Sequence, residues 1–187
     1  MIEFERARSE THENLSTTNI VFIGYRGTGK STIAARVGEI LGRRVISIDA
    51  EIERREGRKI TDIFPQSGEG YFREVESQVC REVSLMDGVI IDPGAGAILR
   101  PENRTALGSN AVMILLSASN EVMADRIRQN ATRPSLTGTK SAADEVAEVM
   151  RIREPLYREL ADYEIKTDML SIEASAEAVA GLFQAED

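Results

Sequence analysis

The sequence contains one histidine, His12, and one cysteine, Cys80, and this scarcity excludes several kinds of chemistry. A Ser-His-Asp triad, a histidine-ligated zinc site and a Cys-His nucleophile all need an imidazole, and His12 lies in a polar stretch near the N-terminus. A single cysteine cannot form an intramolecular disulfide, which is typical of proteins of the reducing cytoplasm. We therefore expect a cytoplasmic protein whose chemistry rests on neither imidazole groups nor disulfides.

Long apolar runs and an excess of positive charge are also missing. No run approaches the roughly 18 residues that a membrane-spanning helix needs, and the N-terminal stretch lacks the apolar core of a signal peptide. The 187 residues carry 23 Lys and Arg against 31 Asp and Glu, a net charge of −8. Because the chain has no basic cluster, nucleic acid and membranes are excluded as partners.

The remaining composition is that of a globular protein. Apolar residues make up 42% and charged residues 29% of the chain, so its length can support a buried core. Residues 1–18 are polar and without periodicity, and we expect a flexible tail there. The rest, residues 19–187, is expected to form a single domain.

Short apolar runs alternate with helical patterns along this domain. We expect strands at 20–23, 45–48, 89–91, 111–116 and 165–167, and helices after the glycine-rich loop at 24–29 and over 50–56, 68–86, 120–130, 142–161 and 174–184. Pro155 should kink or interrupt one of these helices. The alternation predicts a three-layer α/β/α fold around a central, mostly parallel five-stranded sheet.

The strongest motif is Gly24-Tyr25-Arg26-Gly27-Thr28-Gly29-Lys30-Ser31, which matches the P-loop pattern G-x-x-x-x-G-K-[S/T] in full. An apolar strand precedes it and an amphipathic helix follows it. Its glycines let backbone N–H groups turn toward a phosphate at the helix N-terminus, while Lys30 reaches the β- and γ-phosphates and Ser31 can ligate Mg²⁺. The sequence therefore predicts an ATP site formed by Gly27, Thr28, Gly29, Lys30, Ser31 and Thr32.

Several further groups are suited to binding an acceptor molecule. Asp49 ends the second predicted strand, which places it at the sheet edge beside the phosphate loop. A carboxylate there can orient a hydroxyl and accept its proton, and arginines such as Arg73 and Arg153 can match the two oxygens of a carboxylate. Asp49 could instead cap the following helix, and most arginines lie on protein surfaces, so these alternatives stay open.

The order of the motifs resembles that of the shikimate kinase family. The matching segments are GYRGTGKST, IDAEIERREGR with ITDIF, GE-x-x-FR-x-x-E, GAGAI, RPSL and R-x-PLY, over roughly residues 19–167. The resemblance implies an ATP-dependent kinase that phosphorylates the 3-hydroxyl of shikimate, a small carboxylated triol, in chorismate and aromatic amino-acid biosynthesis. We also expect a monomer that needs Mg²⁺.

The resemblance also implies roles on the acceptor side. Asp49 would bind the substrate hydroxyls and accept the proton. Arg73 and Arg153 would hold the carboxylate of shikimate, and the loop formed by Gly94, Ala95 and Gly96 would also bind the substrate. Glu76 would orient Arg73.

On the nucleotide side, the resemblance places Arg126 beside the adenine. Arg133, in a mobile lid over about 131–141, would close over the phosphates and act in catalysis together with Lys30 and Asp49. A closing lid excludes water and so limits hydrolysis of ATP. Tyr25 and Arg26 fill variable positions of the loop and receive no role.

Two positions depart from the family pattern. The family usually has Asp-x-Asp at the end of the second strand, where the first Asp assists the Mg²⁺ shell, and here that position is Ser47. Asp92 ends the apolar run of the third strand, as the metal-binding Asp of P-loop proteins does, so we expect it to supply the missing carboxylate. Asp92 could also simply begin the turn before Pro93. Ala95 replaces a glycine, which puts a Cβ near the substrate ring.

Two other functions therefore remain open. The altered loop at Ala95 would suit a kinase of a related cyclic polyol acid, for instance an aminated shikimate. Alternatively, the chain could be a regulatory module that binds nucleotide and has lost phosphoryl transfer. The joint presence of Asp49, Arg73, Arg133 and Arg153 argues against such a loss, because a nucleotide-binding module needs no carboxylate clamp.

Overall fold

A parallel five-stranded sheet in the order β2-β3-β1-β4-β5 forms the centre of the protein. The structure is a computed structural model that describes residues 16–129 and 141–184. Its elements are β1 (Asn19–Ile23), α1 (Lys30–Leu41), β2 (Val45–Ser47), α2 (Ile48–Glu56), α3 (Ile60–Ser84), β3 (Ile90–Asp92), a 3₁₀ turn (Ala97–Leu99), α4 (Pro101–Gly108), β4 (Ala111–Ser117), α5 (Asn120–Gln129), α6 (Val146–Leu160), β5 (Tyr163–Lys166) and α7 (Ile172–Gly181).

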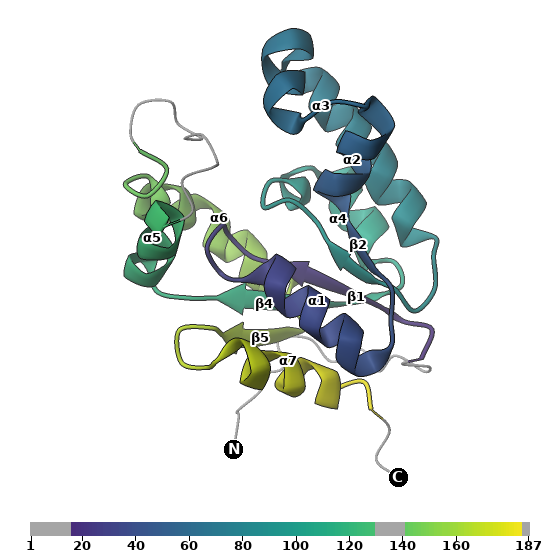
Figure 1. The fold of residues 1–187 in the computed structure, drawn as a ribbon, viewed down its shortest axis with the longest axis vertical. Helices are drawn as coiled ribbons and strands as arrows, with labels where there is room; N and C mark the ends of the chain where they lie inside the picture. Colours follow the sequence, from purple (N-terminus) through teal and green to yellow (C-terminus); the bar gives the residue numbers. More distant parts are fainter. Residues whose placement is uncertain (1–15, 130–140, 185–187) are drawn as a thin grey trace.

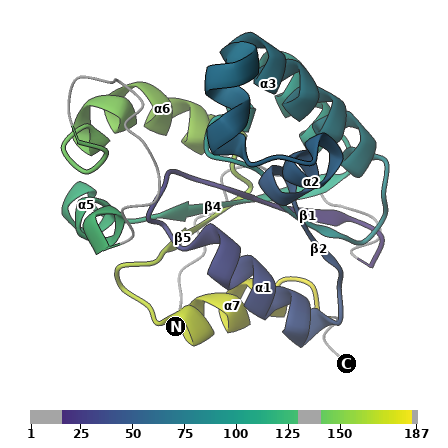
Figure 2. The ribbon, with the colours of Figure 1, turned by 45° about the horizontal axis from the view of Figure 1, so that its top comes forward.

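Helices cover both faces of this sheet, which confirms the predicted three-layer α/β fold. Helices α1 and α7 pack on one face, and α3, α4 and α6 on the other (Figures 1 and 2). Central strand β1 is buried along its whole length, with Ile20 and Phe22 in one core cluster and Val21 and Ile23 in the other. This alternation follows from the two-residue period of a strand that is covered on both sides.

The buried cysteine belongs to the cluster beneath α3. Cys80 is completely buried there, and burial raises the pKa of its thiol to about 12. The thiol is therefore protonated at neutral pH and acts as a small apolar side chain.

The start of α2 differs from the prediction. The strand ends at Ser47 rather than at Asp49, and Asp49 lies in the first turn of α2. The reason is local, because the Ser47 hydroxyl accepts a hydrogen bond from the Ala50 N–H at 3.3 Å and so caps the helix. Ser47, and not Asp49, is the capping residue.

Three other helices also differ from their predicted forms. The helix expected over 68–86 is part of the longer α3, which already begins at Ile60 and has a non-helical kink at Gly68, where φ is 82°. Helix α4 was not expected, although Pro101 in its first turn is a common helix start. Helix α6 begins at Val146 and continues through Pro155, so the proline does not end it.

The predicted tail and lid fall largely outside the described residues. These exclude residues 1–15 and, apart from Ser141, the whole predicted lid with Arg133. The last residues of the predicted tail lie against the sheet, because the carbonyl of Thr17 accepts from the Gly88 N–H at 2.8 Å and Thr18 is buried. Within the described segments, every helix is too short or too polar to cross a bilayer.

Two helical glycines allow the packing against β2 to be tested. A Cβ added to Gly38 would lie 2.5 Å from the side chain of Val45, whereas one added to Gly70 would meet nothing within 4 Å. We expect Gly38→Ala to lower the free energy of unfolding by about 1–3 kcal/mol through overpacking. Gly70→Ala should raise it by about 0.5–1 kcal/mol through helix propensity. Denaturant unfolding of both variants checks this, and equal effects would contradict the packing of Gly38.

Candidate active site

The loop between β1 and α1 has the conformation that phosphate binding requires. Gly24, Gly27 and Gly29 have φ values of 138°, 82° and 90°, which side chains with a Cβ rarely adopt. A Cβ on Gly24 would also lie 2.3 Å from the carbonyl oxygen of Leu116 in β4. The glycines therefore meet a steric need of this loop.

A cavity of about 450 Å³ opens along this loop and the first turn of α1. Its lining includes Lys30, Ser31 and Thr32 from α1 and Arg126 from α5. The Lys30 ammonium donates hydrogen bonds to the carbonyl oxygens of Gly24 at 2.8 Å and of Tyr25 at 2.9 Å. The predicted nucleotide ligands thus share one cavity at the N-terminus of a helix, where the helix dipole favours anions.

Arg126 joins the two walls of this cavity. Its guanidinium donates to the Gly27 carbonyl at 3.1 Å and to the hydroxyl and carbonyl of Thr167 at 3.0 and 2.9 Å. The side chain therefore ties the phosphate loop to the segment that follows β5. Its place beside an adenine stays a prediction.

Asp92 and Ser31 are in direct contact at the sheet edge. The Ser31 hydroxyl donates to Asp92 Oδ2 at 2.6 Å, and Asp92 is buried at the end of β3. Ser47 is the cross-strand partner of Asp92 in the β2–β3 pair. Across the described segments, no group of three or more His, Cys, Asp and Glu side chains could hold a metal by itself. A divalent ion here would therefore take most of its ligands from phosphates and water.

The loop after β3 brings the predicted acceptor residues together. A Cβ on Gly94 would lie 2.9 Å from Asp49 Oδ1, and a Cβ on Gly96 would lie 3.0 Å from both terminal nitrogens of Arg73. Asp49, although it sits in a helix rather than at a strand end, thus reaches the same loop as Arg73. Both glycines leave space that the two charged side chains occupy.

Glu76 holds Arg73 in the way that the resemblance implies. The carboxylate is buried, with 1% of the side chain exposed, and lies 2.8 Å from Arg73 Nη1. Burial raises the pKa of Glu76, an effect that the charge of Arg73 opposes. A second carboxylate, that of Glu69, accepts from the same guanidinium at 3.3 Å. Arg73 is therefore fixed from two sides.

Ala95 contacts α6 through its backbone. Its carbonyl oxygen accepts hydrogen bonds from the Tyr157 hydroxyl at 2.8 Å and from Arg153 Nη1 at 3.5 Å. No carboxylate in the described part of the chain forms an ion pair with Arg153. Arg153 is thus a cation beside the acceptor loop, with a neutral carbonyl as its hydrogen-bond acceptor.

The structure adds contacts that sequence reasoning missed. Arg26 Nη2 lies 3.1 Å from Glu145 Oε1, and the two side chains are 9% and 0% exposed. Tyr25 is also completely buried. The P-loop pattern leaves both loop positions open, and Glu145 is 119 residues from Arg26. No sequence signal could have paired them.

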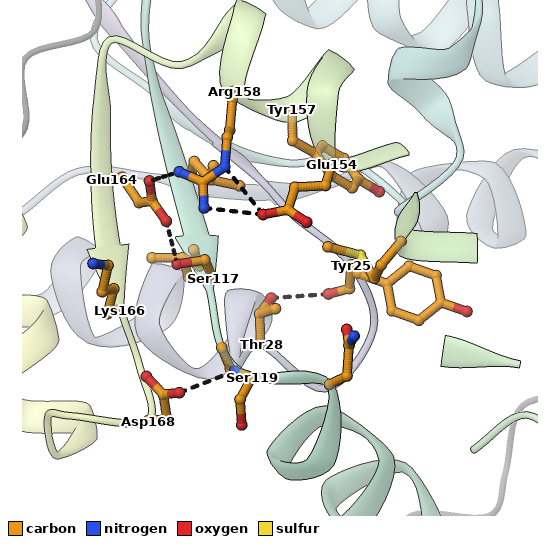
Figure 3. A pocket seen from close by; sticks show the side chains of 15 residues that line it. Tyr25, Thr28, Ser117, Ser119, Glu154, Tyr157, Arg158, Glu164, Lys166 and Asp168 are labelled. Atoms are coloured by element: carbon orange, nitrogen blue, oxygen red, sulfur yellow. Dashed lines mark hydrogen bonds and ion pairs between the residues drawn. The ribbon is translucent and has the colours of Figure 1, made fainter. Parts of the chain in front are cut away.

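A second cavity, of about 330 Å³, lies at the ends of β4 and β5 (Figure 3). Arg158 contacts both Glu154 and Glu164 there, and Asp168 accepts from the Ser119 N–H at 2.9 Å. None of the predicted acceptor residues lines this cavity. Thr28 of the phosphate loop lines both cavities, so this polar pocket adjoins the predicted nucleotide site from the side of β4 and β5.

These features define a class of protein. A glycine loop with a lysine follows the central strand, and a carboxylate and arginines face the loop of the neighbouring strand. This combination is that of a P-loop kinase acting on a small molecule. Comparison with known proteins gives the particular family.

A family model described as shikimate kinase matches residues 26–182, and the chain belongs to this family. Shikimate kinase of Caldicellulosiruptor bescii is 36% identical over 169 residues, 90% of this chain and 97% of that protein. The Dehalococcoides mccartyi enzyme is 37% identical over 149 residues, 80% of this chain and 84% of its own. The structure of Acinetobacter baumannii shikimate kinase in complex with shikimate superposes with a TM-score of 0.82 at 32% identity, covering 89% of this chain and 93% of that one.

Proposed function

We propose that the protein transfers the γ-phosphoryl group of ATP to the 3-hydroxyl of shikimate. The observation that carries this proposal is the position of Asp49 against the loop at residues 94–96. That loop follows Asp92, which contacts Ser31 of the phosphate loop, so the carboxylate lies near the predicted phosphate site. A small molecule with several hydroxyl groups and one carboxylate is the acceptor that this arrangement fits.

Two arginines provide recognition of the acceptor carboxylate in this proposal. Arg73 is held by Glu69 and Glu76, which fixes its direction but also shares its charge. Arg153 has no ion pair in the described segments. Because a guanidinium and a carboxylate can form two parallel hydrogen bonds, Arg153 gains the stronger new interaction when the acceptor binds.

The phosphoryl transfer itself follows from the groups at the sheet edge. Asp49 orients the acceptor hydroxyl and accepts its proton as the new oxygen–phosphorus bond forms. The bond to the bridging oxygen breaks, and ADP leaves with that oxygen. Lys30 offsets the charge on the β- and γ-phosphates, and the backbone N–H groups around Gly27 and Gly29 bind the phosphate oxygens. The role of Arg133 remains a prediction from the resemblance.

Kinases of this family use ATP with a divalent ion, and we propose Mg²⁺. Ser31 and Asp92 fit such an ion, because hydroxyl and carboxylate oxygens are the ligands that Mg²⁺ prefers, and here they lie 2.6 Å apart. When bound, the ion would neutralise charge on the β- and γ-phosphates. Ser47 cannot contribute a negative charge, and its hydroxyl already caps α2.

A monomeric enzyme of the cytoplasm is part of the same proposal. The single cysteine is buried and protonated, which suits a reducing compartment. Sedimentation of the purified protein measures its oligomeric state directly.

The acceptor is tested by coupled measurement of ADP production with shikimate, an aminated shikimate and other cyclic hydroxy acids. We expect ADP production that depends on both shikimate and Mg²⁺. If only the aminated compound stimulated ADP production, the assignment of shikimate as the acceptor would be wrong, but the assignment as a kinase would stand. A failure of every acceptor would instead favour the nucleotide-binding regulatory module.

Arg73 and Arg153 together form the proposed carboxylate clamp, and Arg153→Ala tests it. Loss of a charge-assisted pair worth about 2–3 kcal/mol should raise the KM for shikimate roughly 30- to 150-fold and leave the KM for ATP nearly unchanged. Arg151, an exposed arginine on the same helix, provides the matched control, and Arg151→Ala should change neither constant. Equal losses for ATP and shikimate would contradict the assignment of Arg153.

The metal contact is tested by Asp92→Asn. The variant keeps an oxygen for the Ser31 hydroxyl but loses the negative charge, so we expect half-maximal activity and nucleotide binding to need more Mg²⁺. Adding Ser47→Asp should recover part of the loss, because Asp also caps helices and lies across from position 92. Calorimetric Mg²⁺ titration of the four members of this cycle separates the two contributions. An unchanged titration for Asp92→Asn would leave Asp92 as a turn residue only.

A further inference from the structure

Tyr25 occupies an open position of the P-loop pattern, yet it is completely buried. Its backbone carbonyl is fixed inside the loop, where it accepts hydrogen bonds from the Thr28 hydroxyl at 2.8 Å and the Lys30 ammonium at 2.9 Å. Its ring belongs to the same core cluster as Tyr157 of α6. The backbone of Tyr25 thus belongs to the nucleotide site, while its ring packs in the core with α6.

Two guanidinium groups lie against this ring. The Cζ atom of Arg153 is 5.9 Å from the ring centroid, and that of Arg26 is 5.6 Å away. Both distances fall within the range of about 6 Å in which a cation is attracted to the face of an aromatic ring. In the described segments Arg153 donates a long hydrogen bond of 3.5 Å to the Ala95 carbonyl and lies beside the Tyr157 hydroxyl, so the Tyr25 ring is one of three groups that hold it.

The neighbouring residue attaches the loop to the same helix at a second point. Arg26 forms its buried ion pair with Glu145, the residue directly before α6. Positions 145 and 153 are about 12 Å apart along a helix. Glu145 also offsets the charge of Arg26, which leaves Arg153 as the cation on this side of the acceptor loop without an acidic partner in the described segments.

We propose that Tyr25 is a positioning residue for acceptor binding, whose ring holds the Arg153 guanidinium where it meets the acceptor carboxylate. This inference rests on the proposed function, because it takes Arg153 as a ligand of the acceptor. Through Tyr25, the loop that binds nucleotide also sets the position of Arg153 in the carboxylate clamp. The part of the residue that matters is the flat ring, since the attraction is between a cation and its face.

The hydroxyl of Tyr25 allows two explanations to be distinguished, namely that the aromatic ring positions Arg153 or that the hydroxyl does. It is buried and has no hydrogen-bond partner in the described segments. A phenylalanine would keep the ring and remove only this unpaired group, whose burial is unfavourable. If the ring is what positions Arg153, Tyr25→Phe preserves acceptor binding.

The test compares Tyr25→Phe with Tyr25→Met, which fills a similar space without an aromatic face. We expect Tyr25→Met to raise the KM for shikimate roughly 3- to 30-fold, and Tyr25→Phe to change it less than about twofold. The KM for ATP should stay within about twofold in both variants, because the loop backbone is unchanged. A loss in Tyr25→Phe as large as in Tyr25→Met would overturn the proposal and make the hydroxyl the active contact.

Combination with Arg153→Ala shows whether Tyr25 acts through Arg153. In the Arg153→Ala background, Tyr25→Met should raise the KM for shikimate no further, whereas independent action would multiply the two losses. Multiplied losses would overturn the proposal. If Arg153→Ala strongly raised the KM for shikimate and Tyr25→Met did not, the positioning role of Tyr25 would be refuted, while the assignment of Arg153 would stand. If Arg153→Ala itself left the KM unchanged, the assignment of Arg153 in the proposed function would fail as well.

Because Tyr25 lies in the core, each variant is first measured by thermal unfolding, and kinetics are recorded well below the lowest melting temperature. Tyr25→Leu serves as a second variant without a ring if Tyr25→Met does not fold. The same selective rise in the KM for shikimate is expected from it, and a parallel rise for ATP would contradict a role confined to the acceptor clamp.

Discussion

The site depends on one constraint, which is the close approach of the backbone of the phosphate loop between β1 and α1 to β4 and α5. A Cβ on Gly24 would lie 2.3 Å from the Leu116 carbonyl of β4, and one on Gly27 would lie 2.8 Å from the Met123 carbonyl of α5. The loop therefore rests on the sheet and on α5 without side chains between them. This contact fixes where the carbonyls of residues 24 and 25 point, and with them the Lys30 ammonium that they bind.

The order of the strands places the predicted acceptor residues next to this phosphate loop. Because β1 lies between β3 and β4 and all strands are parallel, the loops after β1 and β3 emerge side by side at one edge. Ser31 and Asp92 meet across that edge, and the loop at 94–96 continues from it to Asp49 and Arg73. The residues predicted to bind nucleotide and acceptor thus follow one another along one edge of the sheet.

The sequence was sufficient for the parts of this arrangement that depend on local pattern. Apolar runs predicted all five strands, and the P-loop spacing predicted the loop after β1 and the helix that begins at Lys30. The capping residue of α2 was harder to predict, because Ser and Asp are both favoured at helix N-termini. Only the structure shows that Ser47, rather than Asp49, caps the helix. Contacts set by tertiary packing, such as Arg26 with Glu145, leave no pattern in the chain and could not be predicted.

The two tyrosines beside the acceptor loop also have a spectroscopic consequence. The chain has no tryptophan and only four tyrosines, and two of these, Tyr25 and Tyr157, are buried next to Arg153. Half of the tyrosines therefore lie beside Arg153, and the chain has no indole to mask their emission. The protein thus carries an intrinsic optical reporter beside the predicted acceptor residues, and tyrosine emission can report a change around these rings without any label.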